Sequence, residues 1–435
     1  MYRIPYGKTF LEFELPSSMR GSLAVSPAVE PLTDVTGAIA EALARPIGSP
    51  PIRELADPGS RVCIVFTDIT RASPDWLLIP PILQQLEEAG VRDEDITLLC
   101  GTGLHRPSTM EEKVAKLGAA VVERYRVLDN EPQNPSALVD LGVVNQIPLS
   151  VHKVAWEAEL LIATGIVEPH QYAGYSGGGK TVAVGAAGEP LIAYSHGPEF
   201  IDNPNTRLGQ VEGNPFQEAI AQAALRAGLN LIINVVLDKD KQVVAVMAGE
   251  PVATHRRLVA KAKQLYQVSV PCQYDVVIGG VGFPKDANLY QASRAASYLF
   301  FAPTPVVRPG GYLIIPAPCQ EGAGEGVGEQ RFLAAMRDAP NVQFILEDGR
   351  KHGYPPGQQR AFVMAKVLER NRVIIVGSQY PELITECKML PKATMEEALA
   401  TAAAELGTEL EVLVVPQALL TLPIVEDYGV LGVRF

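Results

Sequence analysis

The sequence predicts an α/β protein with two domains, each built on a mainly parallel sheet that helices cover. Three observations predict this fold class. The chain has 435 residues, which is too long for one ordinary domain. Apolar runs of strand length alternate with helical stretches along most of the chain. A fresh alternating series begins at YDVVIGGVGFP (274–284), so we place the domain boundary near 268–274.

The N-terminal domain is expected to span residues 1–268. Its best strand is RVCIVFTD (61–68), an apolar run that ends in Asp, as expected of a strand buried on both faces. The expected elements are a strand in TFLEFELP (9–16), a linking segment at 44–60, the strand at 61–68, a helix near 75–89, a strand and loop at 95–103, a helix near 108–117, strands near 119–127 and at 159–167, a helix at 214–228, a strand at 229–238 and a helix at 254–268.

The C-terminal domain is expected to span residues 269–410, and a terminal strand and tail at 411–435 could pack back on the N-terminal domain. The expected elements are strands in YDVVIGGVGFP (274–284), GGYLIIPAPC (310–319), VQFILED (342–348) and RVIIVGS (372–378), helices in SRAASYLFFA (293–302), QQRAFVMAKVLER (358–370) and TMEEALATAAAELG (394–407), and a last strand in ELEVLVVPQA (409–418).

Composition and charge exclude several classes of function. The formal net charge of −12 argues against a nucleic-acid binder and against a protein that binds anionic membranes. No apolar run approaches the roughly 20 residues that a membrane-spanning helix needs, and the first residues lack a signal-peptide core. The five cysteines include no C-x-x-C pair, which argues against a disulfide framework and a zinc cysteine cluster. We expect a soluble, cytoplasmic protein.

The segment GYSGGGKT (174–181) fits the phosphate-loop pattern G-x-x-x-x-G-K-[ST] of nucleotide triphosphatases. A true phosphate loop follows its strand directly and opens a long helix. Here EPHQYA separates the expected strand from the first glycine, and TVAVGAAGEP after the lysine is poor helical sequence. Two interpretations stay open: a triphosphatase, or a glycine loop that binds some other phosphate beside Lys180.

Three of the six histidines lie in loops rich in Gly, Pro and Asn. They are His105 in GTGLHRP, His170 in EPHQYAG and His196 in YSHGPEFIDNPN. A single loop histidine is usually a solvated surface residue, but histidine is also the commonest metal ligand and the commonest acid or base near neutral pH. The other three, at positions 152, 255 and 352, are interpreted as structural or surface residues.

Two further polar pairs are candidates for substrate binding. TDITR (67–71) ends a strand with Asp68 and Arg71, and such an arginine can hold a carboxylate or phosphate through two hydrogen bonds. Gln291 and Arg294 are three residues apart at the start of an expected helix, so they share one helix face. The alternative for both pairs is ordinary capping and a solvated polar surface.

Together these segments resemble one protein family. The segments are GTGLHRP, EPHQYAGYSGGGK, SHGPEFIDNPNTRLGQVEGNP, GFPKDANLYQA and PAPCQEGAG. They are similar to those of the lactate racemase catalytic subunits, which are nickel-pincer enzymes, and the resemblance extends from TDITR to about RAFVMAKVLE. It implies an isomerase, a racemase or epimerase of 2-hydroxy acids, whose active site lies in the cleft between two α/β domains.

The resemblance also implies a cofactor, the nickel complex of pyridinium-3-thioamide-5-thiocarboxylic acid mononucleotide. Lys180 would hold it covalently, and His196 would be the nickel ligand, which suits low-spin Ni(II) with soft sulfur ligands. The glycine loop would bind the cofactor's phosphate. The residues that would contact the cofactor are Thr102, Gly103, Ser176, Gly177, Gly178, Gly179 and Lys180.

By the same resemblance His105 and His170 would be the catalytic acid and base, while C2 is inverted by reversible hydride transfer to the cofactor. The substrate, a small 2-hydroxy carboxylate, would be bound by Asp68, Arg71, Gln291 and Arg294. The expected protein partners are the enzymes that build the cofactor; no nucleic acid and no membrane is expected.

Two positions depart from the family pattern. Some members have a lysine where this chain has Arg294, and a tryptophan of the second domain has no counterpart in PPGQQRA (355–361). Both departures leave the identity of the 2-hydroxy acid open. The alternatives are a phosphate-loop triphosphatase, a zinc hydrolase that uses the same histidines, and a non-catalytic carrier of nickel or a nucleotide.

Overall fold

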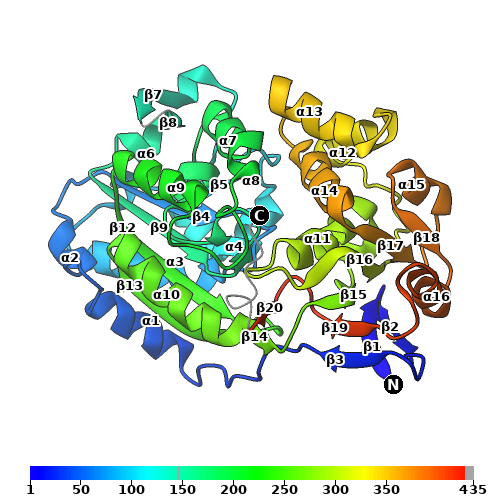
Figure 1. The fold of residues 1–435 in the computed structure, drawn as a ribbon. Helices are drawn as coiled ribbons and strands as arrows, with labels where there is room; N and C mark the ends of the chain where they lie inside the picture. Colours follow the sequence, from blue (N-terminus) through cyan, green and yellow to red (C-terminus); the bar gives the residue numbers. More distant parts are fainter. Residues whose placement is uncertain (145–146, 427–435) are drawn as a thin grey trace. The chain divides into compact units, whose positions relative to one another are not determined.

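The computed structural model describes residues 1–144 and 147–426 and confirms an α/β protein with two compact units (Figure 1). Unit I consists of residues 28–196 and 211–265; unit II consists of residues 1–27, 197–210 and those from 266 onward. The first 27 residues and the segment 197–210 therefore group with the C-terminal half, whereas the sequence suggested one N-terminal block. Part of the expected tail, 427–435, lies outside the described residues.

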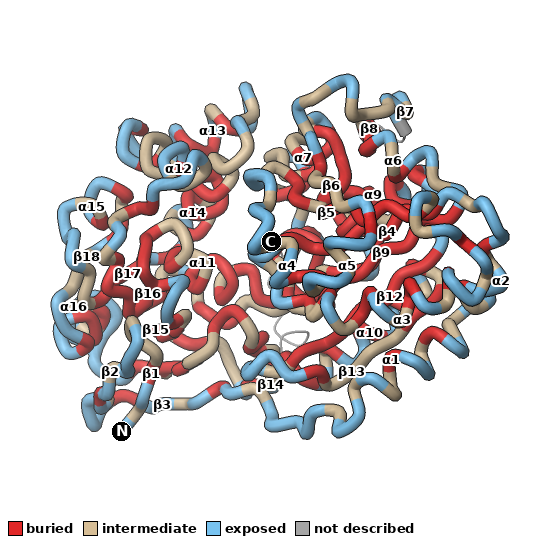
Figure 2. Tube along the Cα trace, turned by 180° about the vertical axis from the view of Figure 1, so that it is seen from behind, coloured by how far each residue is buried: buried red, intermediate tan, exposed pale blue. Residues whose placement is uncertain are grey.

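The central sheet of unit I has the strand order β13-β12-β9-β4-β5-β6. All neighbours run parallel except β13, which is antiparallel to β12. The inner strands are buried along almost their whole length, which explains their unbroken apolar sequences (Figure 2). The strands are β4 (Val62–Thr67), β5 (Ile96–Gly101), β6 (Arg126–Asp129), β9 (Leu160–Ile166), β12 (Leu229–Leu237) and β13 (Val243–Gly249).

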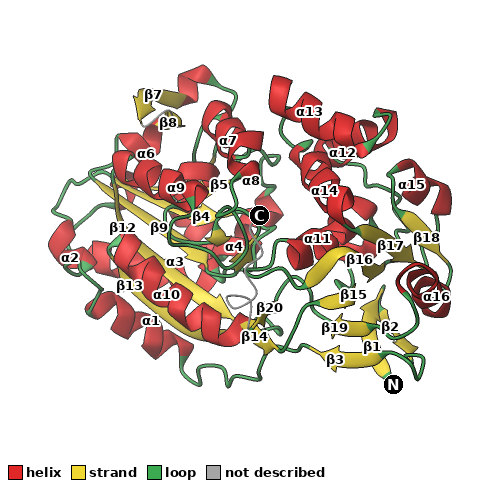
Figure 3. Ribbon diagram, viewed as in Figure 1, coloured by secondary structure: helices red, strands yellow, loops and turns green. Residues whose placement is uncertain are grey.

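Helices and two small hairpins surround this sheet (Figure 3). The hairpins are β7 (Leu138–Val144) with β8 (Ile147–His152), and β10 (Pro169–His170) with β11 (Gly174–Tyr175). The helices are α1 (Val35–Ala44), α2 (Ile52–Leu55), α3 (Asp75–Glu88), α4 (Met110–Leu117), α5 (Ala119–Arg124), α6 (Lys153–Trp156), α7 (Glu189–Ser195), α9 (Pro215–Arg226) and α10 (Pro251–Tyr266), with a π-helix, η3, at Thr181–Gly185 and short 3₁₀ turns at Asp93–Asp95 and Pro135–Ala137.

Unit II contains a second sheet, with the order β18-β17-β16-β15-β19-β3, in which all neighbours run parallel. A hairpin of β1 (Tyr2–Tyr6) and β2 (Thr9–Phe13) and a parallel pair of β14 (Gln267–Val270) and β20 (Leu422–Val425) complete its strands. The sheet strands are β3 (Arg20–Leu23), β15 (Tyr274–Gly279), β16 (Val307–Pro316), β17 (Arg372–Val376), β18 (Leu390–Lys392) and β19 (Glu411–Val415).

The helices of unit II include one from the middle of the chain. This helix, α8 (Pro198–Asp202), is held by Asp202, whose carboxylate pairs with Arg350 at 2.7 Å and with Lys366 at 2.6 Å. These contacts explain why 197–210 groups with unit II. The remaining helices are α11 (Leu289–Phe300), α12 (Val327–Asp338), α13 (Val342–His352), α14 (Gln359–Arg370), α15 (Pro381–Glu386) and α16 (Met395–Leu406), with a 3₁₀ turn at Lys285–Ala287.

Three predictions of secondary structure are wrong. The strand expected near 119–127 is helix α5 followed by β6, and the strand expected in VQFILED is helix α13. In α13 the side chain of Asn341 accepts a hydrogen bond from the N–H of Phe344, an N-cap signal that outweighs the β-like composition. The last described strand is β20 rather than β19.

Candidate active site

The candidate residues of unit I lie in loops that follow the carboxyl ends of parallel strands. Asp68 and Arg71 follow β4, Thr102 and His105 follow β5, and His170 follows β9. In the sheet, β5 and β6 lie on one side of β4, whereas β9 and β12 lie on the other. Such a reversal of strand order opens a crevice at the carboxyl ends, the usual ligand position in an open α/β sheet. The topology thus gathers residues that are far apart in sequence.

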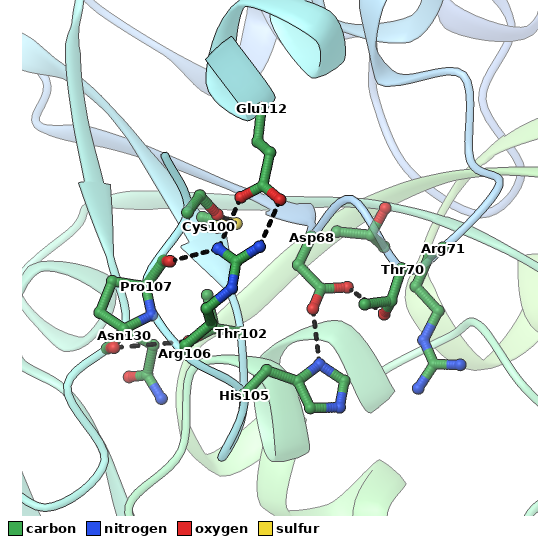
Figure 4. Close-up of polar contacts among 12 residues, drawn as sticks. Asp68, Thr70, Arg71, Cys100, Thr102, His105, Arg106, Pro107, Glu112 and Asn130 are labelled. Atoms are coloured by element: carbon green, nitrogen blue, oxygen red, sulfur yellow. Dashed lines mark hydrogen bonds and ion pairs between the residues drawn. The ribbon is translucent and has the colours of Figure 1, made fainter. Parts of the chain in front are cut away.

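Asp68 and His105 form the best-defined pair of this region (Figure 4). The Nδ1 atom of His105 lies 2.6 Å from Oδ2 of Asp68, and the hydroxyl of Thr70 donates to Oδ1 of Asp68 at 2.7 Å. Because a carboxylate only accepts, we assign the proton to Nδ1, so the lone pair of neutral His105 is on Nε2. Asp68 is buried, while the His105 side chain is 51% exposed and accessible to a ligand.

The surroundings of Asp68 keep its carboxylate charged. Burial by itself would raise the pKa of Asp68. The hydrogen bonds from His105 and Thr70, with the nearby charge of Arg71, outweigh burial and lower the pKa. Arg71 belongs to the same loop as Asp68, and its charge acts on the carboxylate that holds His105, so a base and a cation belong to one group of side chains.

Replacing Asp68 by Asn is expected to reduce turnover by about 10²-fold, because an amide no longer favours the Nδ1–H tautomer of His105 or stabilises its protonated ring. Initial rates of the 2-hydroxy acid inversion that the family resemblance implies measure the effect. Thermal unfolding and metal content should stay close to those of the parent protein, since Asn has the same shape. Full activity of Asp68→Asn would contradict an orienting role for this carboxylate.

Glycines 177–179 are explained by close packing. A Cβ atom on Gly177 would lie 2.8 Å from Oδ1 of Asn234, and one on Gly179 would lie 2.5 Å from Cβ of Ala224. The N–H of Gly178 donates to Oδ1 of Asn234 at 2.8 Å, so one expected phosphate donor is already engaged inside the protein. The glycine loop that precedes Lys180 is therefore closely packed against α9, α10 and β12.

His255, which was interpreted as a structural or surface residue, supports this loop. It is buried on α10, and its Nε2–H donates to the carbonyl of Ser176 at 2.8 Å. A Cβ atom on Gly178 would lie 2.9 Å from its ring. Burial lowers the pKa of His255, which keeps the ring neutral. The only signal in the sequence was the apolar spacing of α10, which the two adjacent arginines obscured.

His170 and His196 belong to one aromatic group. The ring of Tyr172 lies 5.8 Å from that of His170 and 5.3 Å from that of His196, measured between centroids. Phe216, on α9, lies 6.2 Å from His170 and 5.3 Å from His196. The N–H groups of Tyr172 and Ala173 donate to Nδ1 of His170 at 3.3 and 3.2 Å. We therefore assign the proton of neutral His170 to Nε2.

His196 is suited to bind a metal through Nε2. Its Nδ1 lies 2.9 Å from the carbonyl oxygen of Ile192, which fixes the proton on Nδ1 and the lone pair on Nε2. Burial and, secondly, the positive charge of Lys180 outweigh the hydrogen bond to Ile192 and lower the pKa of His196 to about 4. The ring is therefore neutral at pH 7, and Lys180 is near enough to interact with it. Among the described residues, no three His, Cys, Asp or Glu side chains gather as a metal site of their own.

The environment of Lys180 differs from that of a phosphate loop. The β10–β11 hairpin separates β9 from the glycines, and the five-residue π-helix η3 stands where a phosphate loop opens a long helix. The carbonyl of Glu168 accepts the N–H of Ser176 at 2.9 Å. With the N–H of Gly178 also engaged, two backbone donors of the loop bind within the protein and are not offered to a triphosphate.

The β5 loop joins this region through Gly103. Its N–H donates to the carbonyl of Gly185, the last residue of η3, at 2.9 Å, and its φ of +56° favours glycine. Thr102 is buried, and its hydroxyl lies 3.4 Å from the carbonyl oxygen of Asn130. The loop that carries His105 is thus anchored to the helix that follows Lys180.

The candidates of unit II form one polar face of α11. Nη1 of Arg294 donates to Oε1 of Gln291 at 3.2 Å, and its guanidinium carbon lies 5.7 Å from the ring centroid of Tyr298. Asn288 caps the helix by accepting the N–H of Gln291. Arg360, in the segment PPGQQRA, is buried and donates to Oγ of Ser297 at 2.9 Å. Sequence reasoning did not single out this second arginine.

The comparisons with known proteins agree with the fold and these motifs. Residues 6–209 match the family model described as lactate racemase N-terminal domain, and residues 270–422 match the lactate racemase C-terminal domain. No helix in the described part of the chain is long and apolar enough to cross a membrane.

Two relatives and one solved structure extend over almost the whole chain. A lactate racemase of Thermoanaerobacterium thermosaccharolyticum is 31% identical over 424 residues, which cover 95% of this chain and 96% of the relative. A lactate racemase of Lactiplantibacillus plantarum is 33% identical over 390 residues, covering 88% and 89%. The lactate racemase apoprotein of T. thermosaccharolyticum superposes with a TM-score of 0.85 at 29% identity, covering 97% of this chain and 99% of that one. The chain belongs to the lactate racemase family.

Proposed function

We propose that this protein is an isomerase that inverts C2 of a 2-hydroxy acid. Lactate is the first substrate to test, because both relatives are named lactate racemases. The observation that carries the proposal is the His105–Asp68 pair beside Arg71, with 2.6 Å between Nδ1 and Oδ2. An arginine can hold a carboxylate through two hydrogen bonds, and a histidine held in one tautomer can then exchange a proton with the adjacent hydroxyl.

The residues near Lys180 fit the nickel-pincer nucleotide that the family resemblance implies. His196 offers an Nε2 lone pair on a ring that stays neutral at pH 7, as an imidazole ligand must. Lys180 would carry the covalent attachment, and Ser176, Gly177, Gly179, Thr102 and Gly103 would line the bound nucleotide. When bound, the cofactor supplies a hydride acceptor and donor for C2.

The two catalytic histidines are proposed to handle the hydroxyl proton. His105 accepts it at Nε2, because Nδ1 is occupied by a proton shared with Asp68. His170 presents an Nε2–H, because its Nδ1 accepts two backbone N–H groups, and so it donates a hydrogen bond to the substrate oxygen. The proton that His105 takes up is returned to the substrate oxygen before the product leaves, so each turnover leaves both rings in their starting protonation states. One base and one donor match the two positions that the hydroxyl takes in the two enantiomers.

Carboxylate binding is proposed for Arg71, with Asp68 fixing His105 next to it. From unit II, Gln291 and Arg294 would also bind the substrate, since the 3.2 Å hydrogen bond between them fixes both polar ends on one face of α11. A guanidinium offers more donors than the lysine of some family members, so a larger or second carboxylate is compatible with this face.

A chiral assay of cofactor-loaded protein tests the proposal. Enantiopure lactate, 2-hydroxybutyrate, malate, phenyllactate and an aldonate are incubated separately, and enantiomer or epimer ratios are followed. Conversion of at least one substrate is expected, and it should disappear in His170→Ala. If the protein contains nickel and the adduct but converts none of these substrates, the result would favour a non-catalytic carrier. ATP hydrolysis that requires Lys180 would favour a triphosphatase. Hydrolytic activity of protein that contains zinc and no cofactor would favour a zinc hydrolase.

A further inference from the structure

A buried ion pair lies beneath the loop that carries Asp68 and Arg71. Nζ of Lys116, at the end of α4, lies 2.7 Å from Oδ2 of Asp75, the first residue of α3. Asp75 is fully buried and Lys116 is 5% exposed. Burying an ammonium and a carboxylate costs free energy, because both lose their hydration. Two apolar residues of similar size in their place often give a protein that is equally stable. The pair therefore needs an explanation besides stability.

The other contacts of Lys116 lead to the loop between β4 and α3. Its Nζ donates to the carbonyl of Arg71 at 3.2 Å and to that of Ser73 at 2.8 Å. The N–H of Arg71 donates to the carbonyl of Asp68 at 3.1 Å. The backbone of Arg71 is thus held on both sides, and one of the two holding groups is the buried ammonium.

The contacts of Asp75 connect the same loop to the rest of the site. Its carboxylate accepts the hydroxyls of Thr67 at 2.8 Å, Ser73 at 3.0 Å and Thr164 at 2.6 Å. The carbonyl of Thr164, on β9, accepts the hydroxyl of Thr181, the residue after Lys180, at 2.9 Å. Through Asp75 the network connects the end of β4 with β9, the two strands between which the strand order of the sheet reverses.

We propose that the Asp75–Lys116 pair is a positioning unit that fixes the backbone of Arg71, and with it the guanidinium, for the carboxylate of the substrate. The inference rests on the proposed function, in which Arg71 binds that carboxylate. Neither residue of the pair touches the substrate. Misplacement of a binding group by about 1 Å can cost roughly 10²-fold in rate, so loss of the pair should weaken substrate use strongly.

The test uses the double variant Lys116→Met/Asp75→Asn, which removes both charges together and leaves no unpaired buried charge. We expect it to fold and to carry the Lys180 adduct and nickel. Its kcat/KM should fall by about 10²-fold, mainly through a higher KM. The matched control is Lys113→Met, on the same helix, whose Nζ pairs with Asp129 at 2.6 Å. This control should change kcat/KM by less than about threefold.

A double-mutant cycle separates positioning from general stability. If the pair acts through Arg71, adding Arg71→Ala to the double variant should lower kcat/KM little further, whereas Arg71→Ala alone should lower it strongly. Independent, additive losses would overturn the proposal, and so would a double variant with kcat/KM near that of the parent. If the double variant unfolds, Thr67→Val replaces it, because this change removes the hydroxyl that is hydrogen-bonded to both Asp75 and Lys116. The same cycle with Arg71→Ala is then measured, and a smaller fall in kcat/KM is expected.

The parent protein distinguishes this inference from the function on which it rests. A loaded parent that converts no 2-hydroxy acid contradicts the proposed function itself. A parent that is active, combined with a double variant that is equally active, contradicts only the positioning role.

Discussion

Alanine in place of His105 or His170 is expected to lower racemisation by about 10²–10⁴-fold, the usual contribution of a positioned acid or base. The structure assigns different Nε2 states to the two rings, a lone pair on His105 and an N–H on His170. Neither ring can replace the other, so each single variant should lose most of the activity in both directions. Chiral chromatography of initial rates, started from each enantiomer, measures the loss.

Nickel content and the mass of the Lys180 adduct serve as controls for both histidine variants. His105 lies in the β5 loop and His170 in the β10–β11 hairpin, while the proposed metal ligand is His196. Cofactor should therefore remain bound. Loss of nickel in His105→Ala would contradict its role as a base and indicate a ligand instead. Unchanged activity in either variant would remove that residue from the catalytic pair.

Lys180→Ala is expected to abolish both the covalent adduct and the racemisation. The physical reason is the loss of the amine, which follows the closely packed glycine loop and whose charge lowers the pKa of His196. Intact-mass measurement of protein produced with the cofactor-building enzymes shows whether the adduct is present. Lys180→Arg keeps the positive charge but has no primary amine to acylate, so it should fail in the same way.

The lysine variants also separate the two interpretations of the glycine loop. If the loop serves ATP, the parent protein should hydrolyse ATP and both lysine variants should lose that activity. The π-helix η3 and the engaged N–H of Gly178 argue for no ATP hydrolysis in any of them. An adduct that persists in Lys180→Ala would place the covalent attachment on another residue.

The sheet of unit I was predictable because its inner strands are buried on both faces. VCIVFT and LLIATGI have apolar side chains at nearly every position. Short runs of this kind are typical of parallel strands that helices cover on both faces. The helices at 119–124 and 342–352 were mistaken for strands, since the first contains the pair VV and the second begins with the strand-like run VQFIL. Their helical state depends on capping and on packing against neighbouring helices, which composition does not reveal.

The site was predictable only as far as its motifs extend. The resemblance identified His105, Asp68 and Arg71, and the structure adds that the first two are hydrogen-bonded. The supporting residues His255 and Lys116 were missed because each is a charged or polar residue on a helix with polar neighbours, and such residues are usually exposed. Their burial depends on contacts between segments far apart in sequence, for example the 2.8 Å hydrogen bond from Lys116 to Ser73.

The origin of the hydrogen at C2 of the product tests the central claim most directly. Cofactor-loaded protein is incubated with an enantiopure 2-hydroxy acid in D₂O, and deuterium at C2 of both enantiomers is measured by mass spectrometry and NMR during conversion. If the histidines handle only the hydroxyl proton and C2 exchanges a hydride with the cofactor, the product keeps its original C2 hydrogen. Deuterium that enters C2 as fast as the enantiomers interconvert would contradict this account and indicate proton abstraction from carbon.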